Sequence, residues 1–197
     1  MKLPLLDVMK MNTKNGTRCK TFVMISAVVV LLWAAAAAWP SQIALIITDE
    51  RTGSAVFAAA ANPGDSFVIR FIHSVHGTPV EEHFVLTKNL ELVLTKVVYE
   101  SYGAGNPSGV KAGERFSLRD GKIIIDGMNR TMKMIRLRTG QIAADHELKI
   151  HQERLALGKL AQPGSLVVMQ AKRVSPFFLW RTGSVKDLEA RRGMDEP

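Results

Sequence analysis

The chain has 197 residues, a formal net charge of +8 and one cysteine. Its lysines and arginines form no run interleaved with aromatic residues, which argues against nucleic-acid binding. No cysteine follows Pro40, so the long remainder of the chain has no intradomain disulfide, no thiol nucleophile and no thiolate metal site.

The first forty residues predict a membrane anchor. Residues 1–20 carry five basic side chains and one acidic side chain, and Thr21–Trp39 contains 19 residues without a charge. As a helix this stretch is roughly 28 Å long, about the thickness of the hydrocarbon core of a bilayer. Because the positive charges precede it, we expect residues 1–20 in the cytoplasm, residues 21–40 as a single-pass anchor in the cytoplasmic (inner) membrane, and residues 41–197 outside, in the periplasm.

A cleaved signal peptide is the alternative. Ala34–Ala38 offers small residues at a cleavage site, and the product would be secreted to the periplasm without an anchor. The apolar run is long for a signal peptide, which favours the uncleaved anchor. In both cases residues 41–197 are exported, and they are enough for a single domain with its own core.

Short strand patterns separated by turns fill the exported part. Ile43–Thr48 and Ala55–Ala61 predict an opening hairpin, and Phe67–Val75 with Val80–Leu86 predicts a central one. Further strands are expected at Leu90–Tyr102, which has the pattern of a central strand, and at Arg115–Leu118, Ile123–Ile125, Thr131–Arg138, 145–151 and 166–173.

Only the chain's last residues look helical in this part. Leu155–Leu160 is expected to be a short strand or a helical turn, and Val185–Arg192 a solvated helix. Many short strands without a long amphipathic helix indicate a mainly β fold, an antiparallel β-sandwich or barrel preceded by one N-terminal transmembrane helix.

The central hairpin has an unusual pattern on its apolar face. His73 interrupts the row of one strand, and Glu82 interrupts the row of the other. Alternate residues of a strand share a face, and a loop at His76–Pro79 brings the two apolar rows together. This register predicts four facing pairs, Val75 with Val80, His73 with Glu82, Phe71 with Phe84, and Ile69 with Leu86.

A carboxylate on an apolar face is costly unless it is paired, so we expect a direct or water-bridged contact between His73 and Glu82. One interpretation is a site for proton transfer or ligand binding, because perturbed titratable pairs gather at such sites. The other is a buried pair that only fixes the register. We favour this structural interpretation, since ion pairs perturb titrating groups without any function.

A glycine-rich segment after the long strand is the second candidate site. It includes Glu100, Tyr102, Gly103 and Gly105, and its glycines allow the backbone to approach an anion or a carboxylate. A tight loop that leaves a strand is an equally good interpretation. The segment lacks the lysine and the helix start of a phosphate-binding loop.

The histidines of the hairpin do not have the spacing of a metal site. His73, His76 and His83 fall out of phase on the two strands, so we expect no zinc site, and we expect no other metal or cofactor. Ser74 follows His73, but adjacent strand residues point to opposite faces. It also does not lie on a Gly-x-Ser-x-Gly turn, so hydrolase chemistry is the less favoured interpretation.

Two motifs of this region resemble a known family. His73-Ser74-Val75 is followed by Thr78-Pro79-Val80-Glu81-Glu82 and then by Ser101-Tyr102-Gly103-Ala104-Gly105, and with the N-terminal anchor this arrangement is similar to the bacterial domain-of-unknown-function family numbered 1850. The resemblance covers about Phe67–Pro107 and assigns no activity. It implies a setting beside tripartite ATP-independent periplasmic (TRAP) transporters of the TAXI type, which import small organic acids, and hence an extracytoplasmic partner of a transporter.

We therefore expect a non-enzymatic accessory or interaction domain that is held at the inner membrane through Thr21–Trp39 and contacts TRAP transporter components or a small carboxylate ligand. The residues expected at its ligand-binding or interaction surface are His73, Ser74, Thr78, Glu81, Glu82, Glu100, Tyr102, Gly103 and Gly105. Two alternatives stay open. One is a small hydrolase-like or ligand-binding enzyme in which His73 is the general base, Glu82 orients it, and Ser74 or water is the nucleophile. The other is a purely structural envelope domain.

Overall fold

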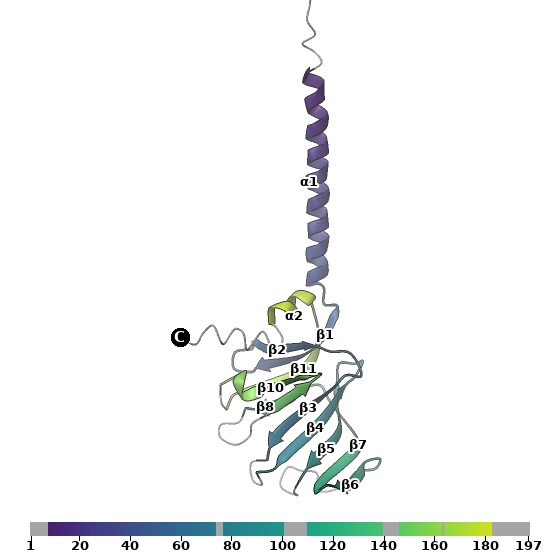
Figure 1. Ribbon diagram of the computed structural model, residues 1–197, viewed down its shortest axis with the longest axis vertical. Helices are drawn as coiled ribbons and strands as arrows, with labels where there is room; N and C mark the ends of the chain where they lie inside the picture. The colour runs from purple at the N-terminus through teal and green to yellow at the C-terminus, as the bar shows by residue number, and fades with distance from the viewer. Residues whose placement is uncertain (1–7, 74–76, 101–109, 140–145, 163, 183–197) are drawn as a thin grey trace, which may run out of the picture.

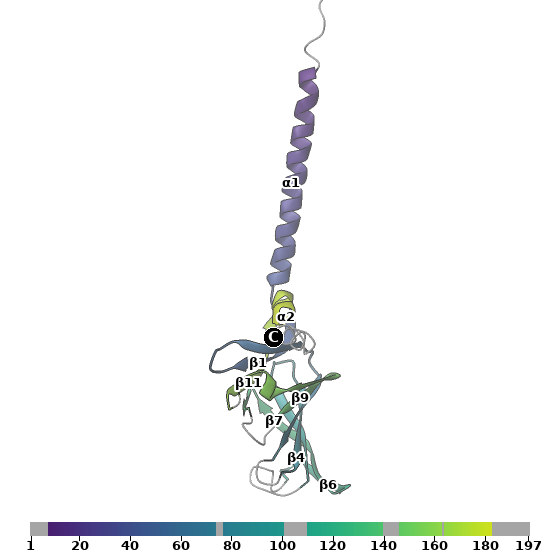
Figure 2. The same cartoon turned by 60° about the vertical axis from the view of Figure 1, so that its left-hand side comes forward.

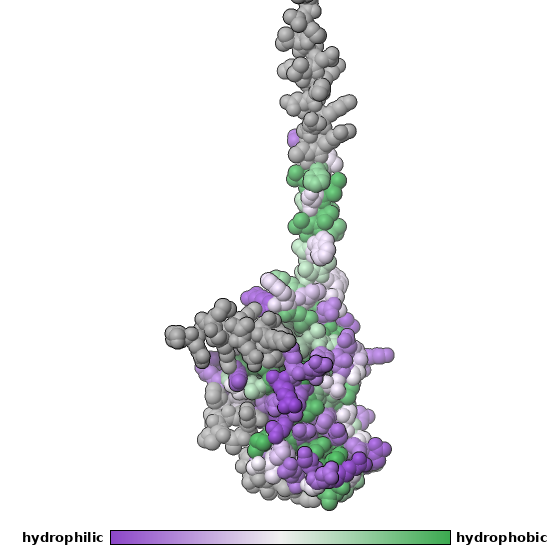
Figure 3. All heavy atoms as spheres, in the orientation of Figure 1, coloured by the Kyte–Doolittle hydropathy of each residue, from purple (hydrophilic) through white to green (hydrophobic). Residues whose placement is uncertain are grey.

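The computed structural model describes residues 8–73, 77–100, 110–139, 146–162 and 164–182. One long helix, α1 (Val8–Ala38), stands clear of a β domain (Figure 1). Its side chains are described from Lys20 onward and are almost all exposed. Figure 3 shows this part of the helix as mainly hydrophobic, whereas the visible face of the β domain is mainly hydrophilic. An apolar helix that packs against so little of its own protein has the surface of a membrane span or a signal sequence.

Two antiparallel sheets form the β domain, as the sequence predicts. The four-stranded sheet has the order β2 (Ala55–Ala60), β1 (Gln42–Asp49), β11 (Leu166–Val174) and β8 (Ile135–Arg138). The seven-stranded sheet has the order β10 (Glu153–Ala156), β9 (Glu147–Ile150), β3 (Ser66–Ile72), β4 (Pro79–Leu86), β5 (Leu92–Tyr99), β7 (Lys122–Met132) and β6 (Arg115–Arg119). One turn of 3-10 helix, Leu157–Lys159, follows β10.

The core lies between the facing surfaces of the two sheets, which we call the inner faces. Alternation along β1 buries Leu45 and Ile47, and alternation along β3 buries Phe67 and Ile69 in the same cluster. The rings of Phe67 and Phe84 stack with their centroids 5.1 Å apart. Each such fully buried side chain contributes about 2 kcal/mol.

A bulge changes which residues of β5 face the core. The strand lies between β4 and β7, so the prediction of a central strand is confirmed. Strict alternation places Val98 on the face of Leu94, but β5 has one extra residue relative to β4, because His83 pairs with Lys96 and Phe84 pairs with Leu94. Val97 and Tyr99 are therefore buried in its place. An extra residue in a strand turns the side chains that follow to the other face.

The register of the central hairpin differs from the prediction. β3 ends at Ile72, which pairs with Pro79. The His73 N–H donates to the Thr78 carbonyl at 2.8 Å, so the connection runs through residues 74–77 instead of 76–79. The observed inner-face pairs are Phe71 with Val80, Ile69 with Glu82, and Phe67 with Phe84.

The prediction that His73 faces Glu82 is therefore wrong, although both lie on strands whose faces alternate as expected. Moving the loop by two residues shifts every pair by an even number, which keeps each residue on its face. Turn chemistry explains the shift. Gly77 ends the loop with φ at 65°, a left-handed conformation that glycine adopts at no steric cost. Pro79, which has no N–H, takes the first position of a strand, where proline is tolerated.

One predicted strand is two strands in the structure. The sequence predicts a single strand over Thr131–Arg138, but β7 ends at Met132 and β8 begins at Ile135. The two strands belong to different sheets. The chain crosses from the seven-stranded to the four-stranded sheet between them, and a continuous apolar pattern gives no sign of such a crossing.

A short helix, α2 (Pro176–Thr182), covers the outer face of the four-stranded sheet. Its N-terminus has proline at the first helical position, and the Phe178 N–H donates to Ser175 Oγ at 3.1 Å. Phe178 and Leu179 pack on a small apolar cluster made of Ala44, Ile46, Ala58 and Val174. The sequence analysis does not predict this helix, and the helix that it expects at 185–192 lies outside the described residues.

β6 is one edge of the seven-stranded sheet, and two large apolar side chains on its inner face are exposed. Phe116 pairs with Ile125 and Leu118 pairs with Ile123, and both isoleucines are buried. Phe116 and Leu118 are nevertheless 49% and 66% exposed. Figures 1 and 2 place β6 at the end of the β domain furthest from α1. The four-stranded sheet does not extend over this edge.

Candidate interaction site

The predicted site residues that the structure describes fall into separate places. His73 is buried at the end of β3, and Thr78 is its backbone partner in the hairpin. Glu100 is exposed directly after β5, whose last residue pairs with the second residue of β4. These three residues therefore share one end of the seven-stranded sheet. Ser74, Tyr102, Gly103 and Gly105 lie outside the described residues.

Glu81 and Glu82 are adjacent in sequence but lie on opposite faces of β4. Glu81 faces outward and carries two long ion pairs, each 3.8 Å, to Arg70 Nε and Lys149 Nζ, and its Oε2 also lies 3.8 Å from His83 Nε2. About a third of its side chain is exposed. Ion pairs of this length at a partly exposed site contribute little to stability. We interpret this outer cluster as a solvated sheet face.

Within the outer cluster, His83 lies in surroundings that disfavour its charged form. Its Nε2 atom is buried without a hydrogen bond partner in the part of the chain that the structure describes. Burial lowers the pKa of His83, the neighbouring Lys96 lowers it further, and Glu81 acts in the opposite direction. The neutral imidazole is therefore the favoured form in the folded protein.

Glu82 interrupts an apolar row on the inner face. Its direct neighbours on the two adjacent strands, Ile69 and Val97, are 0% and 2% exposed. Burial raises the pKa of Glu82, and the positive charge of Arg130 partly opposes this rise. The row continues across the sheet in register as Leu148, Ile69, Glu82, Val97, Ile125 and Phe116.

Glu82 and His73 lie too far apart to form a pair, either as a site for proton transfer or ligand binding or as a contact that fixes the register. The two lie four strand positions apart, about 13 Å along the sheet at 3.3 Å per residue. His73 thus neither fixes the register together with Glu82 nor is oriented by it as a general base. A structural account of Glu82 as half of a register-fixing pair no longer holds.

Arg130 is the charged residue that the sequence analysis missed. It pairs with Leu94 in register and lies on β7 between the inward-facing Met128 and Met132. Its Nη2 donates to Glu114 Oε1 at 3.0 Å. The methionine alternation on either side of Arg130 is the signal that could have found it, since the same period places all three on one face.

Glu114 holds Arg130 in place. Only 5% of the Glu114 side chain is exposed, and its Oε2 accepts a hydrogen bond from the Lys111 N–H at 2.9 Å. That backbone hydrogen bond is the main reason that the pKa of Glu114 lies below its usual value, and Arg130 lowers it further. The result is a line of alternating charge, from Glu82 through Arg130 to Glu114, that leads from the core to the side of β7.

A close backbone approach positions this line. Gly127 has φ at 71°, and a Cβ at this position would lie 2.7 Å from the Gly113 carbonyl oxygen. Only glycine fits here, because a side chain would meet the backbone of the turn that carries Glu114. The irregular pairing of β5 and β7 between Leu94 and Lys96 lies beside the same contact.

His146 is a further residue that sequence reasoning did not single out. Its ring stacks on Phe71 with the centroids 5.4 Å apart, and its carbonyl accepts a hydrogen bond from the Leu157 N–H at 2.7 Å. It directly precedes β9, which pairs with β3. It therefore lies at the same end of the sheet as His73.

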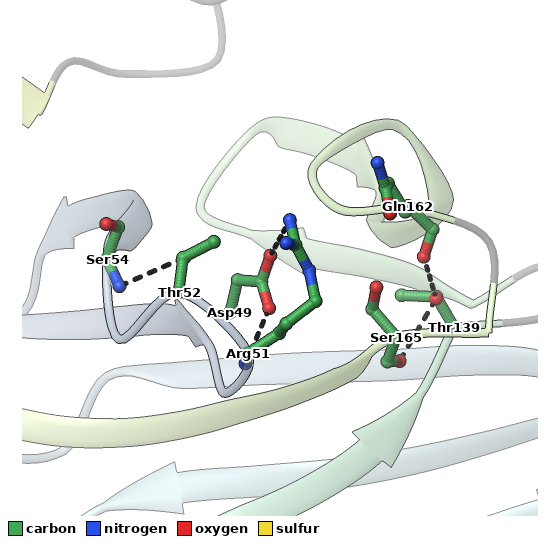
Figure 4. A network of polar contacts seen from close by, with 7 residues as sticks. All are labelled: Asp49, Arg51, Thr52, Ser54, Thr139, Gln162 and Ser165. Atoms are coloured by element: carbon green, nitrogen blue, oxygen red, sulfur yellow. Dashed lines mark hydrogen bonds and ion pairs between the residues drawn. The ribbon is translucent and has the colours of Figure 1, made fainter.

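A second polar network, shown in Figure 4, has a structural role. Asp49 is 4% exposed, and its Oδ1 accepts a hydrogen bond from the Arg51 N–H at 2.9 Å in the turn between β1 and β2. Nearby, Thr139 Oγ1 lies 2.9 Å from the Gln162 carbonyl and 3.1 Å from the Ser165 carbonyl. These contacts satisfy backbone groups of connections. Among the described residues no three His, Cys, Asp or Glu side chains gather as metal ligands.

Together, these features define a class of protein, an antiparallel two-sheet β domain that follows an apolar helix. Lys20–Ala38 is long and apolar enough to cross a membrane, and a signal sequence has the same character. The family model of a domain of unknown function, DUF1850, matches residues 67–157. Residues 67–157 are therefore similar to that family, and the similarity extends well beyond the two motifs that suggest it. No curated protein and no solved structure matches the chain significantly.

Proposed function

We propose that this chain is a membrane-anchored accessory protein that acts outside the cytoplasmic membrane by binding a component of a TRAP-type solute transporter. The apolar helix supports the anchor, and the resemblance of the hairpin motifs supports the transporter setting. The positive charges before the apolar stretch Thr21–Trp39 support an external β domain. The proposal assigns no reaction to the chain.

The observation that carries the binding role is the uncovered inner face of β6. Phe116 and Leu118 are large exposed apolar side chains on the same face as their partners on β7, Ile125 and Ile123, which are buried. Exposed apolar surface of this kind marks contacts with a partner. In our proposal a partner packs against β6 and buries Phe116 and Leu118.

Glu82 supplies the polar contact of this surface in our proposal. It shares a row with Phe116, and its ionised form is disfavoured by burial, which a donor from a partner would relieve. A small carboxylate ligand is the alternative occupant. It would have to displace Glu114 from Arg130 and approach Glu82, so a protein partner with a hydrogen bond donor or a positive charge fits better.

The test is co-purification from membranes of a strain that carries the full chain and a TAXI-type TRAP transporter. Phe116→Ser with Leu118→Ser is expected to reduce the recovered transporter about tenfold or more, as expected when central apolar contacts are lost. The melting temperature should stay close to that of the unmodified chain, because both side chains are already exposed.

Met134→Ser is the matched control. Met134 is a large apolar residue, 42% exposed, that lies outside β6. It should leave the recovery of the transporter unchanged. Equal recovery with the β6 double variant would refute the proposed surface, and a fall with both variants would indicate a general loss of the folded protein.

A further inference from the structure

α2 presents two aromatic rings to the solvent while it packs on the sheet with two other side chains. Phe177 and Trp180 are 53% and 77% exposed, and their ring centroids lie 5.8 Å apart. Phe178 and Leu179 face the apolar cluster of the four-stranded sheet. Residues three apart in a helix are neighbours, so the two exposed rings form one continuous surface.

This surface lies beside the end of the apolar helix. α1 and α2 are in contact, and Figures 1 and 2 both show α2 between the end of α1 and the strands β1 and β2. The apolar stretch of α1 ends at Ala38, and the next residue, Trp39, is 68% exposed. When α1 crosses a bilayer, its outer end holds α2 at the level of the lipid head groups. Aromatic side chains concentrate at that level because one part of the ring system is apolar and another is polar.

The charges around α2 suit the same surroundings. Lys172 is exposed and pairs with Ala44, which lies under α2, so the lysine shares the face that carries the helix. Arg181 is exposed in the last turn of α2. Cations next to a membrane surface are attracted by anionic lipids.

We propose that α2 is a second membrane contact of this protein, in which Phe177 and Trp180 insert among the head groups and upper acyl chains of the leaflet that α1 leaves. This inference rests on the proposed function, because it requires α1 to be kept as an anchor. Two contacts restrain the tilt of the β domain, which one helix and a short connection do not. They direct the β6 edge away from the membrane.

The experiment uses the full chain in vesicles of phosphatidylethanolamine and phosphatidylglycerol whose acyl chains carry bromine near the head group. The chain has three tryptophans, so Trp33→Phe with Trp39→Phe leaves Trp180 as the only one. Its fluorescence is expected to be quenched by the brominated lipid and protected from iodide in the water, as for side chains about 5–10 Å deep in the interface.

The matched control moves the reporter to the far end of the domain. A chain that also carries Trp180→Phe and Leu118→Trp has its only tryptophan at another exposed position, 66% exposed in the unmodified chain. The bromine quenching of Trp180 should exceed that of the control about threefold or more, because the control side chain is in water. Equal quenching, with equal access to iodide, overturns the proposal.

The mass of the recovered protein shows whether the first forty residues are retained, so failure of the anchor can be distinguished from failure of the α2 contact. A full-length chain with Trp180 in water keeps the anchor and refutes the membrane contact of α2. A chain that has lost its first forty residues refutes the anchor, and with it the second contact that rests on the anchor. If Trp180 becomes shielded only when the transporter is added to the vesicles, the occupant is a protein and the lipid assignment is wrong.

Discussion

Glu82 is the residue whose surroundings are least favourable to its charge. Its in-register neighbours are apolar and buried, and the nearest charge acting on it, Arg130, is engaged by Glu114. A neutral side chain at such a position is usually more stable, so the charge of Glu82 is expected to cost the fold stability.

Replacing Glu82 by glutamine tests this cost through its pH dependence. A raised pKa means that the folded state binds the proton more tightly than the unfolded state, so stability falls as pH rises from the ordinary value of 4.5 through the higher folded value. Glu82→Gln lacks this loss. The free energy of unfolding of the variant should therefore rise relative to that of the unmodified chain as pH increases through that window, and the difference should persist at higher pH. Urea unfolding at several pH values measures it.

Glu50→Gln provides the comparison for the glutamine variant. Glu50 is exposed and its ion pair with Arg136 is 3.7 Å long, so Glu50→Gln should change the free energy of unfolding by less than about 0.5 kcal/mol. A Glu82→Gln variant that is less stable than the unmodified chain at neutral pH would show that the carboxylate supports the fold through Arg130.

Backbone geometry, and not side-chain chemistry, requires a glycine at Gly127. Its positive φ alone costs an alanine about 1 kcal/mol, and the contact with the Gly113 carbonyl forces the backbone to move as well. Gly127→Ala should therefore destabilise the domain by about 2 kcal/mol or more.

Replacing a second glycine separates the cost of the contact with Gly113 from the cost of the positive φ. Gly53 has a similar φ of 68° and nothing within 4 Å of the added Cβ, so Gly53→Ala should cost only about 1 kcal/mol. Both values come from thermal or urea unfolding. Equal losses for the two variants would mean that the turn carrying Glu114 yields freely and does not fix Arg130.

At the scale of elements, one face of α2 packs on the four-stranded sheet and the opposite face is exposed. Phe178→Ala removes a ring that packs on the four-stranded sheet and should cost about 2 kcal/mol, less than a fully buried ring because Phe178 is only partly buried. Phe177→Ala should change stability in detergent by less than about 0.5 kcal/mol, because the ring is exposed.

Comparing the two alanine variants in vesicles adds a second readout. Only Phe177→Ala should weaken the bromine quenching of Trp180, since its ring lies next to the tryptophan. Loss of stability with Phe177→Ala in detergent would show that this ring packs on the protein and that the division of α2 into two faces is incorrect.

The strand pattern predicts faces better than it predicts partners. Alternation placed Phe67, Ile69 and Glu82 on the inner face, and the structure confirms it. The register depended on where the loop closes, and that is decided by Gly77 and the proline after it, which the apolar pattern does not contain. The bulge on β5 is invisible for the same reason, because an extra residue leaves the composition unchanged.

At the scale of the whole molecule, the two-sheet fold and the apolar helix were predictable, whereas the site was predictable only in part. The hairpin motif places His73 and Thr78 close together, and the structure has them paired through the backbone at one end of the seven-stranded sheet. Arg130, Glu114 and the uncovered Phe116 were not found, because they come together through long-range pairing of β5, β6 and β7. A single sequence does not specify which strand lies at an edge.

The arginines at the two ends of β6 have a further consequence for a protein that displays a bare strand. Two copies joined antiparallel through this edge, centred on Ser117, would match Phe116 with Leu118 but would also set Arg115 of each copy against Arg119 of the other. Like charges directly opposite one another repel, and charged edge residues are a common guard against unwanted sheet extension. The same strand that is open to a heterologous partner thus discourages its own copy, and salt weakens that protection by screening the charges.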